Sequence, residues 1–110
     1  MAASNFVLPK GSSISSCAGN ATLVHQGDGN VVLYNQDRTP LWSTKTSGQD
    51  SANLIMQGDG NLVLYNASNN PLWSSGTSGH PGAKLAIQSD CKLVIYYQGS
   101  PIWYTDTTCN

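Results

Sequence analysis

One nine-residue segment carries hydrogen-bonding side chains at fixed offsets, and the chain contains it three times. The copies start at Gln26, Gln57 and Gln88, which lie 31 residues apart, and the third copy is altered. The recurring side chains are an amide, a carboxylate, a second amide, an aliphatic group and a phenol. Amides donate and accept hydrogen bonds, a carboxylate only accepts them, and a phenol adds a hydroxyl. This set matches a neutral, hydroxyl-rich ligand with one apolar edge, and the segment therefore predicts a sugar-binding site.

The three copies of the motif differ in how completely they keep this set. The first comprises Gln26, Asp28, Asn30, Val32 and Tyr34, the second Gln57, Asp59, Asn61, Val63 and Tyr65, and the third Gln88, Asp90, Lys92, Val94 and Tyr96. Lys92 removes an acceptor and brings a positive charge close to Asp90, and a pair between them would compete with a sugar. We therefore predict two competent sites and a doubtful third. The alternative interpretation is that polar side chains beside a turn only bond backbone groups.

Each motif lies within a longer repeat of short apolar strands. The repeats span about 18–48, 49–79 and 80–109 of a single domain covering 1–110, and each carries a Pro-Leu-Trp or Pro-Ile-Trp segment after the motif. Successive side chains of a strand point to opposite faces, and no segment has helical periodicity. Because repeats of this period bury a face against each other, we predict an all-β fold of three similar antiparallel sheets around a pseudo-threefold axis.

The same alternation predicts which side chains fill the core. The inward set on the strands after the motifs is Val31, Leu33, Leu62, Leu64, Leu93 and Ile95, and the three tryptophans, Trp42, Trp73 and Trp103, are predicted to cluster near the axis. The Asp-Gly pair inside the motif is also a hairpin signal. Gln26 and Tyr34 therefore lie either along one strand or on two strands joined by a tight turn, and the sequence leaves both geometries open.

Composition and the remaining motifs argue against several other functions. With a net charge of −1 and 10% charged residues, the chain lacks the basic stripe of a nucleic-acid-binding protein, and it has no apolar run long enough for membrane insertion. His25 aligns with Met56 and Ile87, which favours a core position over a ligand or a base. Asp28 and Asn30 resemble part of a calcium loop, but no bidentate Glu follows at the required spacing. We therefore expect no enzyme activity, no cofactor and no metal.

The pattern Gln-x-Asp-x-Asn-x-Val-x-Tyr, intact in two copies, resembles the signature of the snowdrop-agglutinin (monocot mannose-binding, bulb-type) lectin family, and the likeness covers essentially the whole chain. It implies a β-prism II fold with three four-stranded sheets and binding of mannose without metal. By that likeness, Asp28 and Asn30 hold the axial 2-hydroxyl, Gln26 and Tyr34 bond the 3- and 4-hydroxyls, and Val32 packs on the ring carbons. The second copy repeats these roles.

The function that follows from the resemblance is a multivalent, non-enzymatic lectin for terminal mannose on high-mannose glycans and glycoproteins. Members of this family often exchange their C-terminal strand between subunits, so a homodimer is expected, and recognition of glycoproteins in defence is implied by the family alone. The alternative is a protein-interaction or bacteriocin-like module in which the sugar sites are relics.

The three cysteines bear on closure of the domain and on its location. Cys17 and Cys109 lie at the two ends of the three-repeat ring, and we hypothesise a disulfide between them that leaves Cys91 free. The alternative is three reduced thiols in a cytosolic protein. The N-terminus lacks the basic start and apolar segment of a secretory signal, which favours a cytoplasmic location, whereas a processed chain would be secreted.

Overall fold

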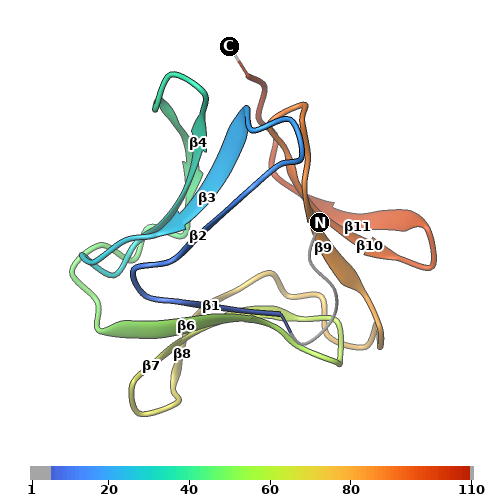
Figure 1. The fold of residues 1–110 in the computed structure, drawn as a ribbon. Helices are drawn as coiled ribbons and strands as arrows, with labels where there is room; N and C mark the ends of the chain where they lie inside the picture. Colours follow the sequence, from blue (N-terminus) through green and yellow to red (C-terminus); the bar gives the residue numbers. More distant parts are fainter. Residues whose placement is uncertain (1–5, 110) are drawn as a thin grey trace.

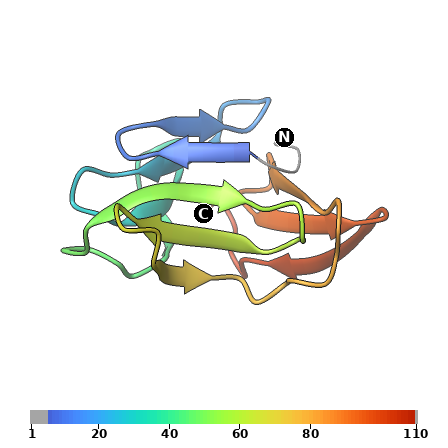
Figure 2. The same ribbon diagram turned by 90° about the horizontal axis from the view of Figure 1, so that it is seen from below.

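Three antiparallel β-sheets surround a central axis in the computed structural model, which describes residues 6–109 (Figure 1). The strands of this part of the chain are β1 (Phe6–Pro9), β2 (Ser13–Ser15), β3 (Ala21–His25), β4 (Val31–Asn35), β5 (Pro40–Ser43), β6 (Ser51–Met56), β7 (Leu62–Asn66), β8 (Pro71–Ser74), β9 (Lys84–Ile87), β10 (Leu93–Tyr97) and β11 (Ser100–Tyr104). The molecule is flat, with extents of 35 × 35 × 19 Å (Figure 2). Residues 6–109 include no helix that is long and apolar enough to cross a membrane.

Two of the sheets have four strands and the third has three. The orders are β2-β3-β4-β5, β1-β6-β7-β8 and β9-β10-β11, and all pairs are antiparallel. The predicted all-β fold of three sheets is confirmed. Within residues 6–109 the third sheet has three strands in place of the expected four, because β1 and β2 are edge strands of the other two sheets: β1 pairs with β6, and β2 pairs with β3. No strand within residues 6–109 pairs with the other edge of β9.

A tight turn joins β3 to β4 and resolves the geometry of the motif. The backbone N–H of Gln26 donates to the carbonyl of Asn30 (2.8 Å), and the N–H of Gly29 donates back to the carbonyl of Gln26 (3.2 Å). Gly29 has a φ of 94°, and a Cβ there would lie 2.1 Å from the carbonyl oxygen of Gln49, so the turn requires glycine. Gln26 thus follows one strand, while Tyr34 lies on the next.

Each sheet contains a β-bulge at the same place, and the bulge places the tryptophans. In the first sheet Leu33 pairs with Trp42, whereas Tyr34 pairs with Pro40, so Leu41 is the extra residue. The register shifts equivalently at Tyr65 and Tyr96. Because paired residues share a face of the sheet, the bulge directs each Trp inward beside a core leucine or isoleucine, while the motif Tyr faces outward.

The core is built as the alternation predicts. The six inward residues named above are all 0% exposed. The indole rings of Trp42, Trp73 and Trp103 meet at centroid distances of 5.4–5.8 Å and interplanar angles of 68–76°. This edge-to-face arrangement places the positive edge of one ring against the negative face of another. The predicted symmetric tryptophan cluster is therefore confirmed.

Candidate functional site

The two ends of each motif meet across its hairpin. Gln26 is the first residue after β3, and its Nε2 donates a hydrogen bond to the hydroxyl of Tyr34 on β4. The same bond joins the glutamine and tyrosine of the second and third copies. Val32 lies between them on the outer face of β4, where it is 4% exposed. The turn therefore gathers an amide, a phenol and an apolar floor on the outside of each sheet.

The motif carboxylate is partly engaged by the turn. Oδ1 of Asp28 accepts the backbone N–H of Asn30 (2.9 Å), and its Oδ2 accepts the hydroxyl of Ser47 (3.2 Å). Asp59 accepts the N–H of Asn61 in the same way (3.0 Å). This bond is of the kind that the alternative interpretation expected, in which the polar side chains bond backbone groups of the turn. It uses one of the about four acceptor sites of each exposed carboxylate, and Ser47 uses a second site of Asp28, so capacity for a ligand remains.

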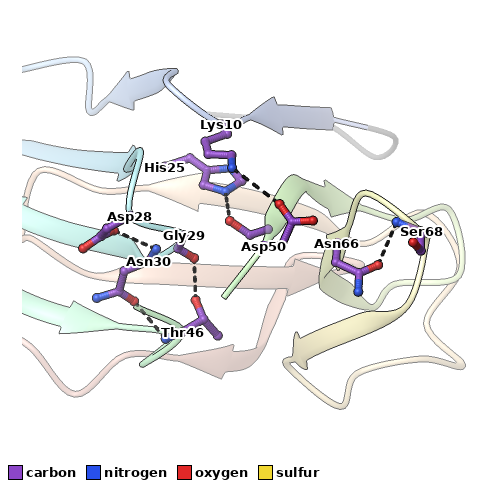
Figure 3. Close-up of polar contacts among 10 residues, drawn as sticks. Lys10, His25, Asp28, Gly29, Asn30, Thr46, Asp50, Asn66 and Ser68 are labelled. Carbon is purple, nitrogen blue, oxygen red and sulfur yellow. Dashed lines mark hydrogen bonds and ion pairs between the residues drawn. The ribbon is translucent and has the colours of Figure 1, made fainter. Parts of the chain in front are cut away.

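The second amide of the motif is held at its oxygen end by the loop that follows the tryptophan. Oδ1 of Asn30 accepts the hydroxyl of Thr44 (3.3 Å) and the backbone N–H of Thr46 (3.2 Å). The hydroxyl of Thr46 in turn donates to the carbonyl of Gly29 (2.8 Å), which ties the loop to the motif turn (Figure 3). With its oxygen fixed in this way, the amide points its Nδ2 donors away from the loop (Figure 3).

The second copy builds the same support. Oδ1 of Asn61 accepts the hydroxyl of Ser75 (3.2 Å) and the N–H groups of Gly76 (3.0 Å) and Thr77 (3.1 Å). The sequence interpretation missed these hydroxyl residues. Their signal was a Ser or Thr followed two positions later by Thr, which recurs after every Trp as Thr44-x-Thr46, Ser75-x-Thr77 and Thr105-x-Thr107.

The third copy reverses the polarity of this contact. Nζ of Lys92 donates to the backbone carbonyl of Thr107 (2.6 Å), so the loop offers a carbonyl where the other two loops offer N–H groups. Oδ1 of Asp90 accepts the backbone N–H of Lys92 (3.2 Å). The anticipated pair between the Asp90 carboxylate and the Lys92 ammonium is not among the ion pairs of residues 6–109. The lysine therefore lies against its own loop instead of neutralising the motif carboxylate.

A cavity of about 420 Å³ lies at the third copy of the motif. It is lined by four motif residues, Gln88, Lys92, Val94 and Tyr96, and by three residues of β11 and the loop after it, Pro101, Tyr104 and Asp106. The last two were missed by the sequence interpretation. The available signal was that Tyr104 stands where the other repeats have Ser43 and Ser74.

The predicted disulfide between Cys17 and Cys109 is not formed, and the prediction is wrong. Cys109 is bonded to Cys91, with the two Cα atoms 5.1 Å apart, and Cys17 is free and exposed. The reason is that the loop after each Trp packs back on the turn of its own repeat. In the third repeat the hydroxyl of Thr107 donates to the carbonyl of Cys91, so the end of the described chain lies against that turn. Cys91 occupies the position of Gly29 in the first repeat, with a φ of 67°.

Ring closure instead involves amide side chains of the first repeat. Nδ2 of Asn35 donates to the carbonyl of Cys109 (3.0 Å), and Nδ2 of Asn20 donates to the carbonyl of Ser89. These contacts join the first repeat to the third without a covalent bond between them. The prediction that the ends of the repeat array meet is thus right, although the sulfur pairing assigned to that junction is not.

His25 is a core residue, as its alignment predicts. It is 0% exposed; its Nδ1–H donates to the carbonyl of Leu8 (2.9 Å), and Nε2 accepts the hydroxyl of Ser51 (2.8 Å). Burial lowers the pKa of His25 below its ordinary value, and the charge of Lys10 lowers it further, while the bond to Leu8 acts in the opposite direction. Residues 6–109 contain no group of three His, Cys, Asp or Glu side chains arranged to hold a metal ion.

The chain superposes on solved lectin structures over nearly its whole length. A Marasmius oreades lectin gives a TM-score of 0.88 at 30% sequence identity, covering 96% of this chain and 89% of the other. A monomeric monocot mannose-binding lectin from Gastrodia elata gives a TM-score of 0.85 at 31% identity, with 96% of each chain covered. The mannose-specific agglutinin of snowdrop (Galanthus nivalis) bulbs, solved with methyl-α-D-mannoside, gives 0.78 at 39% identity, covering 96% of this chain and 94% of the agglutinin. No protein-family model and no curated protein matches the chain.

Three antiparallel sheets around one axis, each with a Gln–Tyr hairpin on its outer face, define a lectin of the β-prism II class. The chain belongs to the monocot mannose-binding (bulb-type) lectin family, as its resemblance to that family indicates. Lectins bind carbohydrate without transforming it, and the prediction that the chain is not an enzyme is confirmed.

Proposed function

We propose that the chain recognises mannose on high-mannose glycans through its first two motif copies. The observation that carries the proposal is their matching polar arrangement, in which Asp28 and Asn30, and likewise Asp59 and Asn61, keep hydrogen-bonding capacity after satisfying the turn and the loop. The snowdrop agglutinin, which is mannose-specific and was solved with methyl-α-D-mannoside, supports the choice of sugar.

In each of these two sites, different polar side chains bond different hydroxyls of the sugar. The carboxylate accepts from the axial 2-hydroxyl, and the asparagine Nδ2 donates to it. Gln26 and Tyr34 bond the 3- and 4-hydroxyls, Val32 packs on the ring carbons, and the second site repeats this arrangement. Because side chains bond the hydroxyls directly, the mechanism uses no metal ion and no covalent step.

Useful affinity arises from the number of sites. A single shallow sugar site binds with a dissociation constant of about 1 mM, which is about −4 kcal/mol. Two sites on different sheets of one rigid domain raise the effective concentration of a branched glycan once its first arm is bound. Multivalent glycoproteins are therefore the expected partners.

The test is the double variant Asp28→Ala with Asp59→Ala, in which each site loses its carboxylate. Hydrogen bonds to charged groups contribute about 1.5–3 kcal/mol, so binding of methyl-α-D-mannoside in calorimetry should fall below detection. The matched control is Asp90→Ala, which removes the equivalent carboxylate from the third copy and should leave the mannoside titration unchanged. Unaltered mannose binding in the folded double variant, checked by circular dichroism, would refute the assigned sites.

Self-association is part of the proposal. The expectation of a homodimer comes from the family, whose members often exchange their C-terminal strand between subunits. A homodimer would double the number of sugar sites. The Gastrodia elata lectin, however, is described as monomeric. Light scattering coupled to size-exclusion chromatography decides the matter, because a mass near 11.7 kDa at micromolar concentration would exclude the dimer.

A further inference from the structure

Three residues that distinguish the third repeat from the other two line one cavity. Lys92 replaces an asparagine, Tyr104 replaces a serine, and Asp106 stands where the other repeats have Lys45 and Gly76. All three lie on the wall of the cavity of about 420 Å³, a size within the range of about 300–1,000 Å³ that is typical of small-molecule sites. Gln88, Val94 and Tyr96 of the motif remain beside them. The third site therefore differs from the other two at these three positions, while its floor is kept.

Tyr104 gives this cavity an aromatic wall. The strand register pairs Tyr104 with Val94, as it pairs Ser43 with Val32 in the first sheet, so the ring lies on the outer face with the motif. Its side chain is 59% exposed. The face of an aromatic ring is electron-rich and attracts the polarised C–H groups of an apolar ligand face. A rigid Tyr also offers this contact at a low cost in conformational entropy.

The two charged residues of the cavity supply hydrogen bonds of opposite kinds. One of the three N–H donors of the Lys92 ammonium is used by the carbonyl of Thr107 (2.6 Å), and two donors remain. Asp106 contributes an exposed carboxylate that accepts. Because their charges offset each other, the pair suits a neutral ligand, and its hydrogen bonds to hydroxyls are charge-assisted. The ligand chemistry is again that of a sugar.

We propose that the third pocket binds a neutral hexopyranose of the glucose type, with an equatorial 2-hydroxyl, stacked on Tyr104. In methyl-α-D-glucoside only the anomeric substituent is axial, so the opposite face of the ring carries axial C–H bonds and no oxygen, and that face can lie on the phenol. Mannose carries an axial oxygen at C2, and the asparagine assigned to that hydroxyl in the other sites is absent here. The inference rests on the proposed function, because it takes over the sugar-binding role of the motif.

The test is a titration of ¹⁵N-labelled protein with methyl-α-D-glucoside and, separately, with methyl-α-D-mannoside, followed by amide NMR shifts. The glucoside should shift the amides of Val94, Tyr104 and Thr105 with a millimolar dissociation constant. The mannoside should shift those near Asn30 and Asn61 and should bind the third pocket at least 5-fold more weakly than the glucoside.

Two variants separate this inference from the proposed function. Tyr104→Ser installs the residue of the other repeats, and it should weaken glucoside binding at least 5-fold without changing the mannoside shifts near Asn30. The double variant Asp28→Ala with Asp59→Ala should keep the glucoside shifts. An unchanged glucoside affinity in Tyr104→Ser, no glucoside shifts at the third pocket, or equal binding of both sugars there would overturn the inference. Wild-type protein that binds glucoside at the third pocket but no mannoside elsewhere would support it while contradicting the proposed function.

Discussion

The first and third copies of the motif share the same backbone frame, meaning the hydrogen bonds that join the loop after the Trp to the motif turn and strand, but they differ in their side chains. In both, the backbone N–H of a threonine donates to the carbonyl of the first residue of the strand that follows the motif turn. Thr44 donates to Val31 and Thr105 donates to Leu93, each at 3.0 Å. In both, a second threonine donates its hydroxyl to the motif turn. The frame therefore depends on backbone groups and on threonines that lie behind the sugar-facing positions. The third copy keeps this frame although Lys92 replaces the asparagine of the other two.

The largest expected effect on mannose binding comes from making the first two sites resemble the third. In the double variant Asn30→Lys with Asn61→Lys, each site loses the amide assigned to the 2-hydroxyl. At about 0.5–1.5 kcal/mol for a hydrogen bond between neutral groups, we expect each site to weaken about 2- to 10-fold for methyl-α-D-mannoside in calorimetry. The control Gln36→Lys adds one such charge at an exposed residue and should bind normally. If the double variant keeps wild-type affinity, the contrast between the copies has no functional meaning.

The next effect concerns the covalent bond that only the third repeat has. The double variant Cys91→Gly with Cys109→Gly installs the residues found at these positions in the first repeat, Gly29 and Gly48. The bond closes a loop with a sequence separation of 18, so its loss should lower the free energy of unfolding by about 3 kcal/mol. The melting temperature should fall by roughly 10–20 °C in calorimetry.

Cys17→Ser is the matched control for this loss, because Cys17 is free and exposed. It should melt with the wild-type protein. Equal destabilisation by Cys17→Ser, together with a 17–109 cross-link in a non-reducing peptide map, would contradict the pairing described above.

The reverse change should repair the third site. The triple variant Lys92→Asn, Tyr104→Ser and Asp106→Gly gives it the residues of the second repeat. We expect the mannoside stoichiometry measured by calorimetry to rise from two sites per chain to three, and the glucoside shifts to disappear. Lys92→Asn alone keeps the aromatic wall and serves as the partial control. A stoichiometry that stays at two would mean that residues outside these three positions determine the difference.

The smallest effect distinguishes the first repeat, whose core holds His25 where the others have Met56 and Ile87. Because its pKa is lowered in the folded state, His25 is neutral in both states well above its ordinary pKa of 6.5. Below that pH the unfolded chain binds a proton that the folded chain resists, so stability falls as pH decreases towards the folded-state pKa. The slope is at most about 1.4 kcal/mol per pH unit.

Urea unfolding at several pH values between 7.5 and 5 checks this dependence, with His25→Met as the comparison. The variant carries the residue of the second repeat and should lose the part of the pH dependence that belongs to the histidine. Parallel stability curves for the two proteins would show that the buried imidazole is protonated as easily in the folded state as in the unfolded chain.

Repetition in the sequence accounts for the parts of the structure that were predicted correctly. Alternation after Asn30 and its two equivalents identified the buried side chains, and three equivalent tryptophans identified the cluster at the axis. These inferences succeed because burial follows the two-residue period of a strand. They also need no knowledge of how the loops are folded.

The features that depend on how the loops and strands pack were missed or predicted wrongly from the repeat pattern. Counting positions along the repeats brought Cys17 to Cys109, but the choice of Cys91 depends on a loop folding back onto its own turn, which no spacing reveals. Tyr104 joins the third pocket through a bulge that shifts the strand register by one residue. The edge strand that the third sheet lacks within residues 6–109 depends on where the N-terminal segment pairs. All three are outcomes of tertiary packing.

The tryptophan cluster has a consequence for how unfolding of this lectin is observed. The chain contains three Trp residues, one from each sheet, and each indole touches both of the others. Opening any one sheet therefore removes two of the three ring contacts and exposes all three indoles to solvent. Their fluorescence reports the closed ring as a whole and no single repeat. A linear array of repeats can fray from its ends, whereas in this ring the optical signal of the axis and the loss of backbone structure should follow one common transition.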